Sequence, residues 1–579
     1  MARRGAAVHV VTTSREYKGK TYRSHLLRRS YREDGKVKNQ TLANLSHLPD
    51  HVIELIRQGL RGQTLRPVEQ SFEIVRSAHH GHVHAVLTTL KRLGFEDLVA
   101  SRPSRQRDLV VAMVAARILE PASKLATTRW WKTSTLAEEL GVADADEEEL
   151  YAAMDWLLGR QSTIERKLAG RHLQENGLVL FDLSSSYFEG THCPLAAFGH
   201  NRDGKTGKLQ VNYGLLTDAA GRPVSVSVFE GNTADPKTLM PQVTRVRKGF
   251  GIKRLVLVGD RGMITQKQID ALREQDDGVD WITALRTEAI RNLVEHGHIQ
   301  MGLFDERNLF ELTHPDFPGE RLVACRNPEL ARLRAHKRRS MLEATVKELD
   351  KVRGMVARGR LAGKDKIGVR VGKVVDHYKM AKHIRLDISD ARFDHAIDEA
   401  AVAAEAALDG IYVVRTSLCA EQLDSADAVR SYKLLANVER AFRSIKTVDL
   451  NVRPIYHWNE DRVRAHIFLC MLAYYVQWHM IQAWRPLLFC DEEQQAKKHR
   501  DPVAPARRSA SALEKVHTRH LADGTPAHSF RTLLTDLATI VRNVCRTPGV
   551  GAELPTFNVV TTPTPAQRRA YELLETFPV

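Results

Sequence analysis

The sequence is poor in cysteine, and its cysteines form neither a metal-binding pattern nor a disulfide pattern. The six cysteines are scattered, at Cys193, Cys325, Cys419, Cys470, Cys490 and Cys545. None forms a Cys-x-x-Cys pair, and no closely spaced His–Cys cluster surrounds them. This argues against a zinc ribbon and against a disulfide framework. Scattered free cysteines suit a reducing cytosol, and because no apolar signal segment follows Met1 we expect a cytoplasmic protein.

Long uninterrupted apolar runs are also lacking. The strongest is Ile467–Trp484, which has 18 residues and as a helix would be about 27 Å long. It contains Gln477, His479 and Gln482, and the charge-rich stretch HWNEDRVR precedes it. Polar groups inside a bilayer are costly, so the run predicts a buried core helix and no span of a membrane.

Acidic residues are fewer than basic ones. Lys and Arg number 86 against 70 Asp and Glu, which gives a net charge of +16 and a pI of about 9.5. The hydrophobic share of 43% supports several buried cores and excludes a wholly disordered chain, a collagen or a small disulfide scaffold. The positive excess favours a polyanionic partner, either nucleic acid or an anionic membrane surface. A well-solvated basic surface is the alternative, and charge alone does not decide.

The N-terminal region is basic and changes from strand-like to helical patterns. Residues 1–40 hold 11 Lys or Arg against three acids, and the turn signal Glu33-Asp34-Gly35-Lys36 predicts a small β-hairpin module. From about 83 to 172 apolar residues recur at helical spacing. These helices include a helix-turn-helix or form a plain bundle; the pattern fits both.

From residue 177 onward short apolar strand runs alternate with helical segments, which predicts an α/β fold with a mixed sheet flanked by helices. The strand runs are 177–182, 209–217, 224–230, 254–260, 280–285 and 410–416. Residues 287–405 interrupt this series and are too long for a loop, so we interpret them as an inserted sub-domain with a helix near 329–357. A further helix is expected around 528–545, followed by a short tail. The predicted regions are 1–76, 77–172, 173–286, 287–405, 406–490 and 491–579, the last a basic linker with a helical extension.

Two acidic residues share a sequence context. Asp182 ends the run LVLFD and Asp260 ends LVLVGD, and each is followed by residues expected to leave the strand. Ligands bind at the carboxyl ends of buried strands in an α/β sheet. Two ionised carboxylates placed there repel each other unless a divalent cation such as Mg²⁺ compensates. The alternative is that each Asp only caps the turn that follows it.

A third acid lies on a predicted amphipathic helix, YKLLANVERAFRSIK. Leu435, Val438, Phe442 and Ile445 form its apolar seam. Tyr432, Glu439 and Lys446 recur every seven residues and so share a neighbouring stripe. Spacing alone is equally typical of an ordinary helix with a solvated charged face.

The ordered motifs FDLSSSYFEG, QVNYGLL, FEGNTADPKTL, VLVGDRGM, GIYVVRTS and YKLLANVERAFRSIK resemble the DDE transposases of bacterial insertion sequences. More narrowly, they resemble the insertion-sequence-four superfamily, which has a Tyr-x₂-Arg-x₃-Glu-x₆-Lys signature. The similarity runs from about residue 177 to residue 480. It implies a ribonuclease-H-like catalytic core split by a β-rich insertion, with a helical N-terminal DNA-binding region.

The resemblance also implies roles for single residues. Asp182, Asp260 and Glu439 would be the catalytic acids and would bind two Mg²⁺ or Mn²⁺ ions per active site. Tyr432 and Lys446 match the signature, and Lys446 would contact the DNA backbone. The signature Arg falls on Leu435, so this chain departs from the pattern. Arg440 or Arg443 is expected to replace it in DNA binding.

The implied partner is double-stranded DNA, both the transposon ends and the target, bound by a homodimer in a paired-end complex at the bacterial nucleoid. The implied reaction is metal-dependent strand cleavage at the terminal inverted repeats followed by strand transfer. A nuclease of the same core without strand transfer, and a catalytically silent DNA-binding regulator, are the alternatives. The loop His200–Lys205 either approaches DNA or is a plain turn, and Asp235 is near the expected site without being a predicted ligand.

Overall fold

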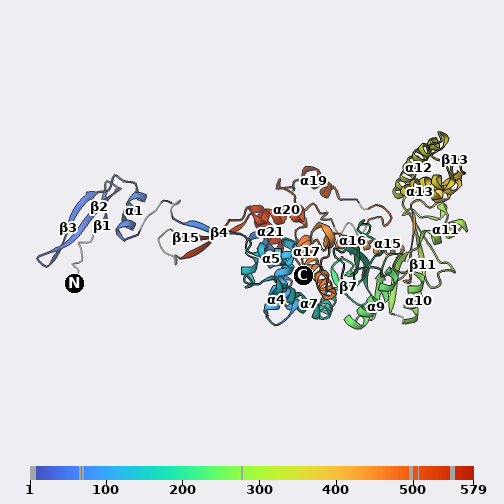
Figure 1. Cartoon of the computed structure of the whole chain (residues 1–579). Helices are drawn as coiled ribbons and strands as arrows, with labels where there is room; N and C mark the ends of the chain where they lie inside the picture. Colours follow the sequence, from blue (N-terminus) through green and yellow to red (C-terminus); the bar gives the residue numbers. More distant parts are fainter. Residues whose placement is uncertain are drawn as a thin grey trace. The chain divides into compact units, whose positions relative to one another are not determined.

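A computed structural model describes residues 8–63, 67, 71–275, 278–493, 500–505, 507–547 and 555–578. The chain forms two compact units (Figure 1). The smaller unit comprises Met1–Ser77 and Arg542–Thr561, and the larger comprises Ala78–Val541 and Thr562–Val579.

The smaller unit begins with a three-stranded antiparallel meander, β1 (Val8–Tyr17), β2 (Lys20–Glu33) and β3 (Lys36–Asn44), followed by helix α1 (Asp50–Leu60). The predicted Asp34-Gly35 turn joins β2 to β3, and both residues have positive φ. A second two-residue turn, Lys18-Gly19, also with positive φ at both residues, joins β1 to β2. Such turns match the twist of the strands that they connect. The predicted hairpin is therefore extended by a third strand.

A second sheet of the smaller unit has the order β16-β15-β4, with β4 at Glu73–His79, β15 at Val541–Arg546 and β16 at Thr556–Val560. The helix predicted around 528–545 is correct only in its first part, where α20 spans Phe530–Ala538. The second part is strand β15, whose Cys545 pairs with Phe557 of β16. The β-branched residues Val541 and Val544 favour a strand once a partner strand is present. Instead of a short tail, helix α21 (Pro565–Thr576) ends the described chain.

The larger unit is built on an eight-stranded mixed sheet with the order β10-β11-β14-β9-β8-β5-β6-β7. β5 pairs parallel with β8, β8 pairs parallel with β9, and the other pairs are antiparallel. The strands are β5 (Gly177–Tyr187), β6 (Gln210–Asp218), β7 (Pro223–Glu230), β8 (Leu255–Val258), β9 (Val279–Ala284), β10 (Leu309–Leu312), β11 (Arg321–Arg326) and β14 (Ile411–Thr416). The prediction of an α/β fold with a mixed sheet is confirmed.

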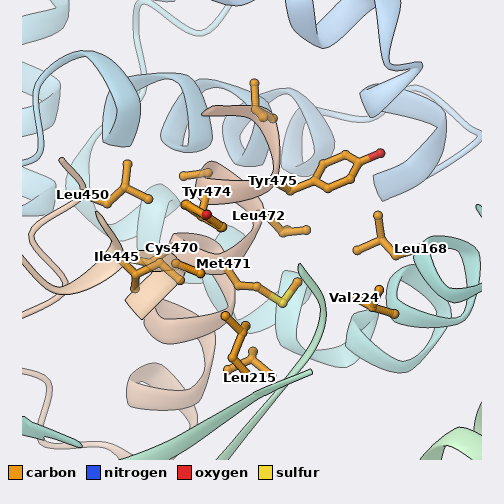
Figure 2. Close-up of a cluster of buried hydrophobic side chains, with 14 of the residues drawn as sticks. Leu168, Leu215, Val224, Ile445, Leu450, Cys470, Met471, Leu472, Tyr474 and Tyr475 are labelled. Carbon is orange, nitrogen blue, oxygen red and sulfur yellow. The ribbon is translucent and has the colours of Figure 1, made fainter. Parts of the chain in front are cut away.

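Helices before the sheet pack on one long helix after it. The earlier helices are α2 (Gly81–Arg92), α3 (Phe95–Val99), α4 (Arg105–Leu119), α5 (Lys124–Trp131), α6 (Leu136–Glu139), α7 (Glu147–Gly159) and α8 (Gln161–His172). The later helix is α17 (Glu460–Ala483), which contacts α2, α4, α7 and β7. Its side chains lie among buried residues of the sheet and helices, with Cys470, Met471, Leu472, Tyr474 and Tyr475 near Leu168, Leu215, Val224, Ile445 and Leu450 (Figure 2).

The apolar run in α17 is thus the centre of a water-excluding core, as predicted. Gln477 and His479 are buried in it with exposed fractions of 0% and 2%. Among the helices that the structure describes, none combines the length and the apolar character that crossing a bilayer requires.

Residues 287–405 contribute to two structures. β10 and β11 join the main sheet, whereas α12 (Pro328–Ala357), α13 (Lys364–Tyr378), β12 (Ile384–Ile388) and β13 (Phe393–Ile397) surround a separate small core. α12, α13 and β13 lie together (Figure 1). Leu349, Ile367 and Phe393 are buried in that core. A pair of long helices with one short strand pair thus stands where the resemblance implied a β-rich insertion.

The remaining helices connect these parts. They are α9 (Leu239–Thr244), α10 (Gln266–Gln275), α11 (Thr287–Glu295), α14 (Glu399–Ala406), α15 (Ser425–Lys433), α16 (Leu435–Arg443) and α19 (Ala510–Thr518). The predicted basic linker falls partly outside the described residues, at 494–499 and 506. Its described part includes α19, which begins after the N-cap Ser509.

Candidate active site

Two neighbouring parallel strands bring Asp182 and Asp260 to the same level. The β5–β8 register pairs Leu180 with Val258, so two residues further along the chain Asp182 stands opposite Asp260. β8 ends at Val258, and Asp260 begins the turn that follows, where its carboxylate accepts a hydrogen bond from the Gly262 N–H at 3.2 Å. Neighbouring strands are about 4.8 Å apart, so both carboxyl groups belong to one edge of the sheet.

The expectation that residues after Asp182 leave the strand is wrong. β5 continues to Tyr187, and residues 183–187 pair with β6, for example Ser186 with Val211. The continuation is possible because β6 and β7 extend the sheet beyond the end of β8. Asp182 therefore lies within a strand whose neighbour on one side has ended, and its side chain is half-buried.

The third acid comes from α16, which follows α15 after a break at Leu434. Val438, Ala441 and Phe442 are buried, and the Phe442 ring packs edge-on against Tyr213 of β6 with 5.7 Å between ring centroids. Burial of this apolar face fixes the helix on the sheet and leaves Glu439 exposed. A single π-turn, Ser444–Val448, ends the helix, and such turns are frequent at functional sites.

These elements line an open cavity of about 950 Å³. Six of the seven residues predicted from the sequence line it: Asp182, Asp260, Glu439, Tyr432, Lys446 and Arg443. Arg440 is not among the lining residues and is exposed. Leu435, at the position of the signature Arg, also lines the cavity.

The acids influence one another electrostatically. The pKa of the Asp182 carboxyl is raised to about 6, first by burial and then by the negative charges of Asp260 and Glu439. The hydrogen bond that the Leu183 N–H donates to Asp182 Oδ1, 2.8 Å long, partly offsets this rise, as does the positive charge of Arg202. A half-buried carboxyl beside two others is a site where a cation would be stabilising.

Carboxylate oxygens are the ligand type that Mg²⁺ and Mn²⁺ prefer, so the donor set fits a divalent metal. Within the described residues, however, no three His, Cys, Asp or Glu side chains converge as a ready-made metal site. Asp182, Asp260 and Glu439 nevertheless line the same cavity.

Tyr432 adds a neutral donor beside the acids. Its hydroxyl donates a hydrogen bond of 3.4 Å to Asp260 Oδ1. Burial raises the pKa of the phenol well above its usual range, and the negative charge of Asp260 raises it further. The hydroxyl therefore stays protonated at physiological pH.

Lys446 is held at the side of the cavity by an ion pair and a hydrogen bond. Its Nζ lies 2.5 Å from Asp203 Oδ1 and donates to Ser184 Oγ at 3.1 Å. Arg453 also forms an ion pair with Asp203, whose side chain is 2% exposed. Burial lowers the pKa of Lys446, and the hydrogen bond to Asp203 opposes that effect. One buried carboxylate thus positions two cations at the cavity.

Arg202 is a further positively charged residue at the cavity, and the sequence analysis assigns it no role. Its Nη2 lies 2.5 Å from Asp235 Oδ1, and its positive charge acts on Asp182. Its Nη1 is buried and has no hydrogen-bond partner within the described structure. The available signal was the polar loop His200–Lys205, which was interpreted only as a turn or a DNA contact.

Comparison with known families identifies the chain. A family model described as a transposase DDE domain matches residues 178–476, and one described as the N-terminal domain of IS1634 family transposases matches residues 10–70. No curated protein matches the chain. A cryo-EM structure of a piggyBac transposase synaptic complex with hairpin DNA matches with a TM-score of 0.32 and 8% identity, over 79% of this chain and 76% of that chain. Because the DDE model spans more than half of the sequence, the protein belongs to the DDE transposases of insertion sequences.

Proposed function

We propose that Asp182, Asp260 and Glu439 are the catalytic acids of this transposase and hold two Mg²⁺ or Mn²⁺ ions. The observation that carries the proposal is that all three line one cavity from three separate elements, where burial and then the charges of the other two acids raise the pKa of Asp182. Bound divalent cations would activate the attacking oxygen and stabilise the leaving oxygen of an in-line displacement at phosphorus.

The chain's own residues supply the rest of the chemistry. Three carboxylates carry −3 and leave part of a +4 metal charge to attract the scissile phosphate. Arg202 and Arg443 add positive charge at the cavity, and we propose that Arg202 takes the place of the signature Arg lost at Leu435. Tyr432 orients Asp260 through its hydroxyl, and no covalent bond to it is needed because the nucleophiles are water and then the freed 3′-OH.

The proposed substrates are the terminal inverted repeats of the element and then a target duplex. Lys446, held by Asp203, would contact the DNA backbone at the cavity. The catalytic core would be ribonuclease-H-like, split by the 287–405 insertion, and would act as a homodimer on paired ends at the bacterial nucleoid in the cytoplasm. The mixed sheet flanked by helices supports that core type.

The test is strand cleavage and joining by the full chain with Mg²⁺ and a DNA duplex carrying an end of its element. Asp182→Asn, Asp260→Asn and Glu439→Gln should each reduce cleavage by more than the roughly 100-fold that losing an outer-shell metal partner costs. Each variant should still bind the duplex. Joined products indicate transposition, whereas cleavage alone indicates a nuclease. Full activity in Asp182→Asn would overturn the assignment.

A further inference from the structure

The N-terminal meander has two projecting two-stranded ends. β1 pairs with residues 20–29 of β2, whereas β3 pairs with residues 26–33. Only Leu26–Arg29 therefore has a neighbour on both sides. Residues 12–25 form a two-stranded ribbon, the β1–β2 ribbon, which ends at the Lys18-Gly19 turn.

Helix α1 occupies one face at the base of this ribbon. Arg57 of α1 donates a hydrogen bond to Thr12 Oγ1, and His25 Nε2 lies 3.6 Å from Asp50 Oδ1. Thr12 and His25 are directly opposite each other in the register, so they share one face. Side chains alternate along a strand, so every second residue, starting at Thr13 in β1 and at Ser24 in β2, points to the opposite face, away from α1.

That opposite face is basic and aromatic. It carries Thr13, Arg15 and Tyr17 from β1, directly opposite Ser24, Tyr22 and Lys20 of β2. Tyr17 and Tyr22 are each 55% exposed, and Arg15 and Lys20 are exposed as well. Within the described ribbon no Asp or Glu is on this face, because its one acid, Glu16, points to the α1 side.

We propose that the β1–β2 ribbon enters a groove of double-stranded DNA with this face. Two strands about 4.8 Å apart fit the roughly 12 Å major groove of B-form DNA, which admits a two-stranded β-ribbon. Arg15 and Lys20 contact phosphates, whereas the hydroxyls of Tyr22 and Ser24 meet base edges. The inference rests on the proposed function, which requires recognition of duplex ends, and it assigns that recognition to a ribbon instead of to the helices of residues 77–172.

The test uses the full chain and a fluorescently labelled DNA duplex of mixed sequence, with affinity measured by anisotropy at a series of NaCl concentrations. Each lost phosphate contact reduces the slope of log affinity against log salt by about 0.9, so Arg15→Ser with Lys20→Ser should reduce it by about 1.8. The matched control is Arg23→Ser with Arg29→Ser, which removes the same charge from the α1 side of β2 and should leave the slope unchanged. All four residues are at least partly exposed arginine or lysine side chains, so folding should be preserved, as checked by circular dichroism.

The outcomes separate the two proposals. The ribbon assignment would be overturned if wild type and the Arg15→Ser, Lys20→Ser variant gave equal slopes of log affinity against log salt. It would also be overturned if this variant and the Arg23→Ser, Arg29→Ser control lost the same amount of slope. Neither outcome affects the proposed Mg²⁺-dependent cleavage. With one labelled strand of the same DNA as a second probe, a loss of affinity confined to that single strand would also overturn the ribbon assignment. A wild-type chain that binds no duplex would overturn the proposed function as well.

Discussion

At the scale of single residues, one loop holds two charged groups of the site against the strand that carries Asp182. The Tyr187 N–H donates to Asp203 Oδ2 at 2.9 Å, and the Arg202 N–H donates to Ser185 Oγ at 3.4 Å. The sequence indicates Asp182 and Asp260 because each follows a short apolar run, and Glu439 because it lies beside a helical seam. It does not indicate Arg202 and Asp203, because their importance comes from the folding of this loop over β5.

The buried Nη1 of Arg202, which has no hydrogen-bond partner within the described structure, leads to a prediction. Arg202→Ala should reduce the rate of DNA cleavage by about 10- to 100-fold, because a hydrogen bond to a charged group contributes about 1.5–3 kcal/mol. Arg202→Lys should recover part of that loss, since it keeps the charge without the planar donor geometry. The measurement is single-turnover cleavage of an end-containing duplex.

Arg440→Ala is the control for this prediction, because Arg440 is exposed and does not line the cavity. It should keep nearly the wild-type cleavage rate. If Arg440→Ala were the more damaging of the two variants, the replacement for the signature Arg would lie on α16 and not on the His200–Lys205 loop.

At the scale of elements, apolar runs predict six of the eight strands of the main sheet, because continuous burial on both faces leaves a clear signal. The other two, β10 and β11, lie inside the segment that the sequence analysis interprets as an insertion. Strand ends were less predictable. The continuation of β5 past Asp182 depends on pairing with β6. β15 lies between β16, the next strand in the chain, and the distant strand β4. The Lys18-Gly19 turn was missed because lysine is not a usual residue at positive φ, unlike the Asp34-Gly35 turn.

β5 and β6 are closely packed beside the acids, which gives a prediction for Gly214. A Cβ added there would lie 2.6 Å from ring carbons of Phe181, the residue before Asp182. Gly214→Ala should therefore lower the free energy of unfolding by about 1–3 kcal/mol through overpacking. Cleavage should also decrease, because the Phe181 ring must move. Urea unfolding of the full chain measures the first effect.

Gly372→Ala is the matched control. Gly372 lies inside α13, and a Cβ there would have nothing within 4 Å. Alanine should raise the free energy of unfolding of the helical pair by about 0.5–1 kcal/mol, because glycine loses more backbone freedom on folding. Equal effects of both substitutions would contradict the packing described for β5 and β6.

At the scale of the whole molecule, the order of regions could be predicted but their packing could not. The N-terminal helices looked like a separate region in the sequence, yet they share one hydrophobic core with the sheet and with α17. The +16 charge predicted a polyanion, and the structure distributes exposed cations on the meander and on α12. Burial of helices on one another leaves no mark in a sequence beyond their own amphipathic pattern.

The shared core also predicts a pH dependence of stability. Burial lowers the pKa of His479 to about 3, with contributions from the charges of His172, Arg222 and Arg171. The unfolded state takes up the proton near pH 6.5 and the folded state only near pH 3, so stability is full above pH 6.5 and declines as pH falls between these values. The decline should be up to about 1.4 kcal/mol per pH unit for this histidine. Thermal unfolding midpoints at several pH values measure it.

His479→Phe keeps a ring in the same aromatic surroundings and removes the titration. It should reduce the slope of stability against pH by about one proton between pH 6.5 and pH 5. An unchanged slope in this variant would contradict the buried neutral state of His479.

Whether the three acids form a metal site can be measured from the position of bound Mn²⁺, located by anomalous scattering in crystals of the full chain with an end-containing duplex. We expect Mn²⁺ in the cavity, coordinated by Asp182, Asp260 and Glu439, and its loss in Asp182→Asn crystals that still contain DNA. Mn²⁺ bound elsewhere, or retained in the cavity without the Asp182 carboxylate, would show that these acids are not the catalytic metal ligands.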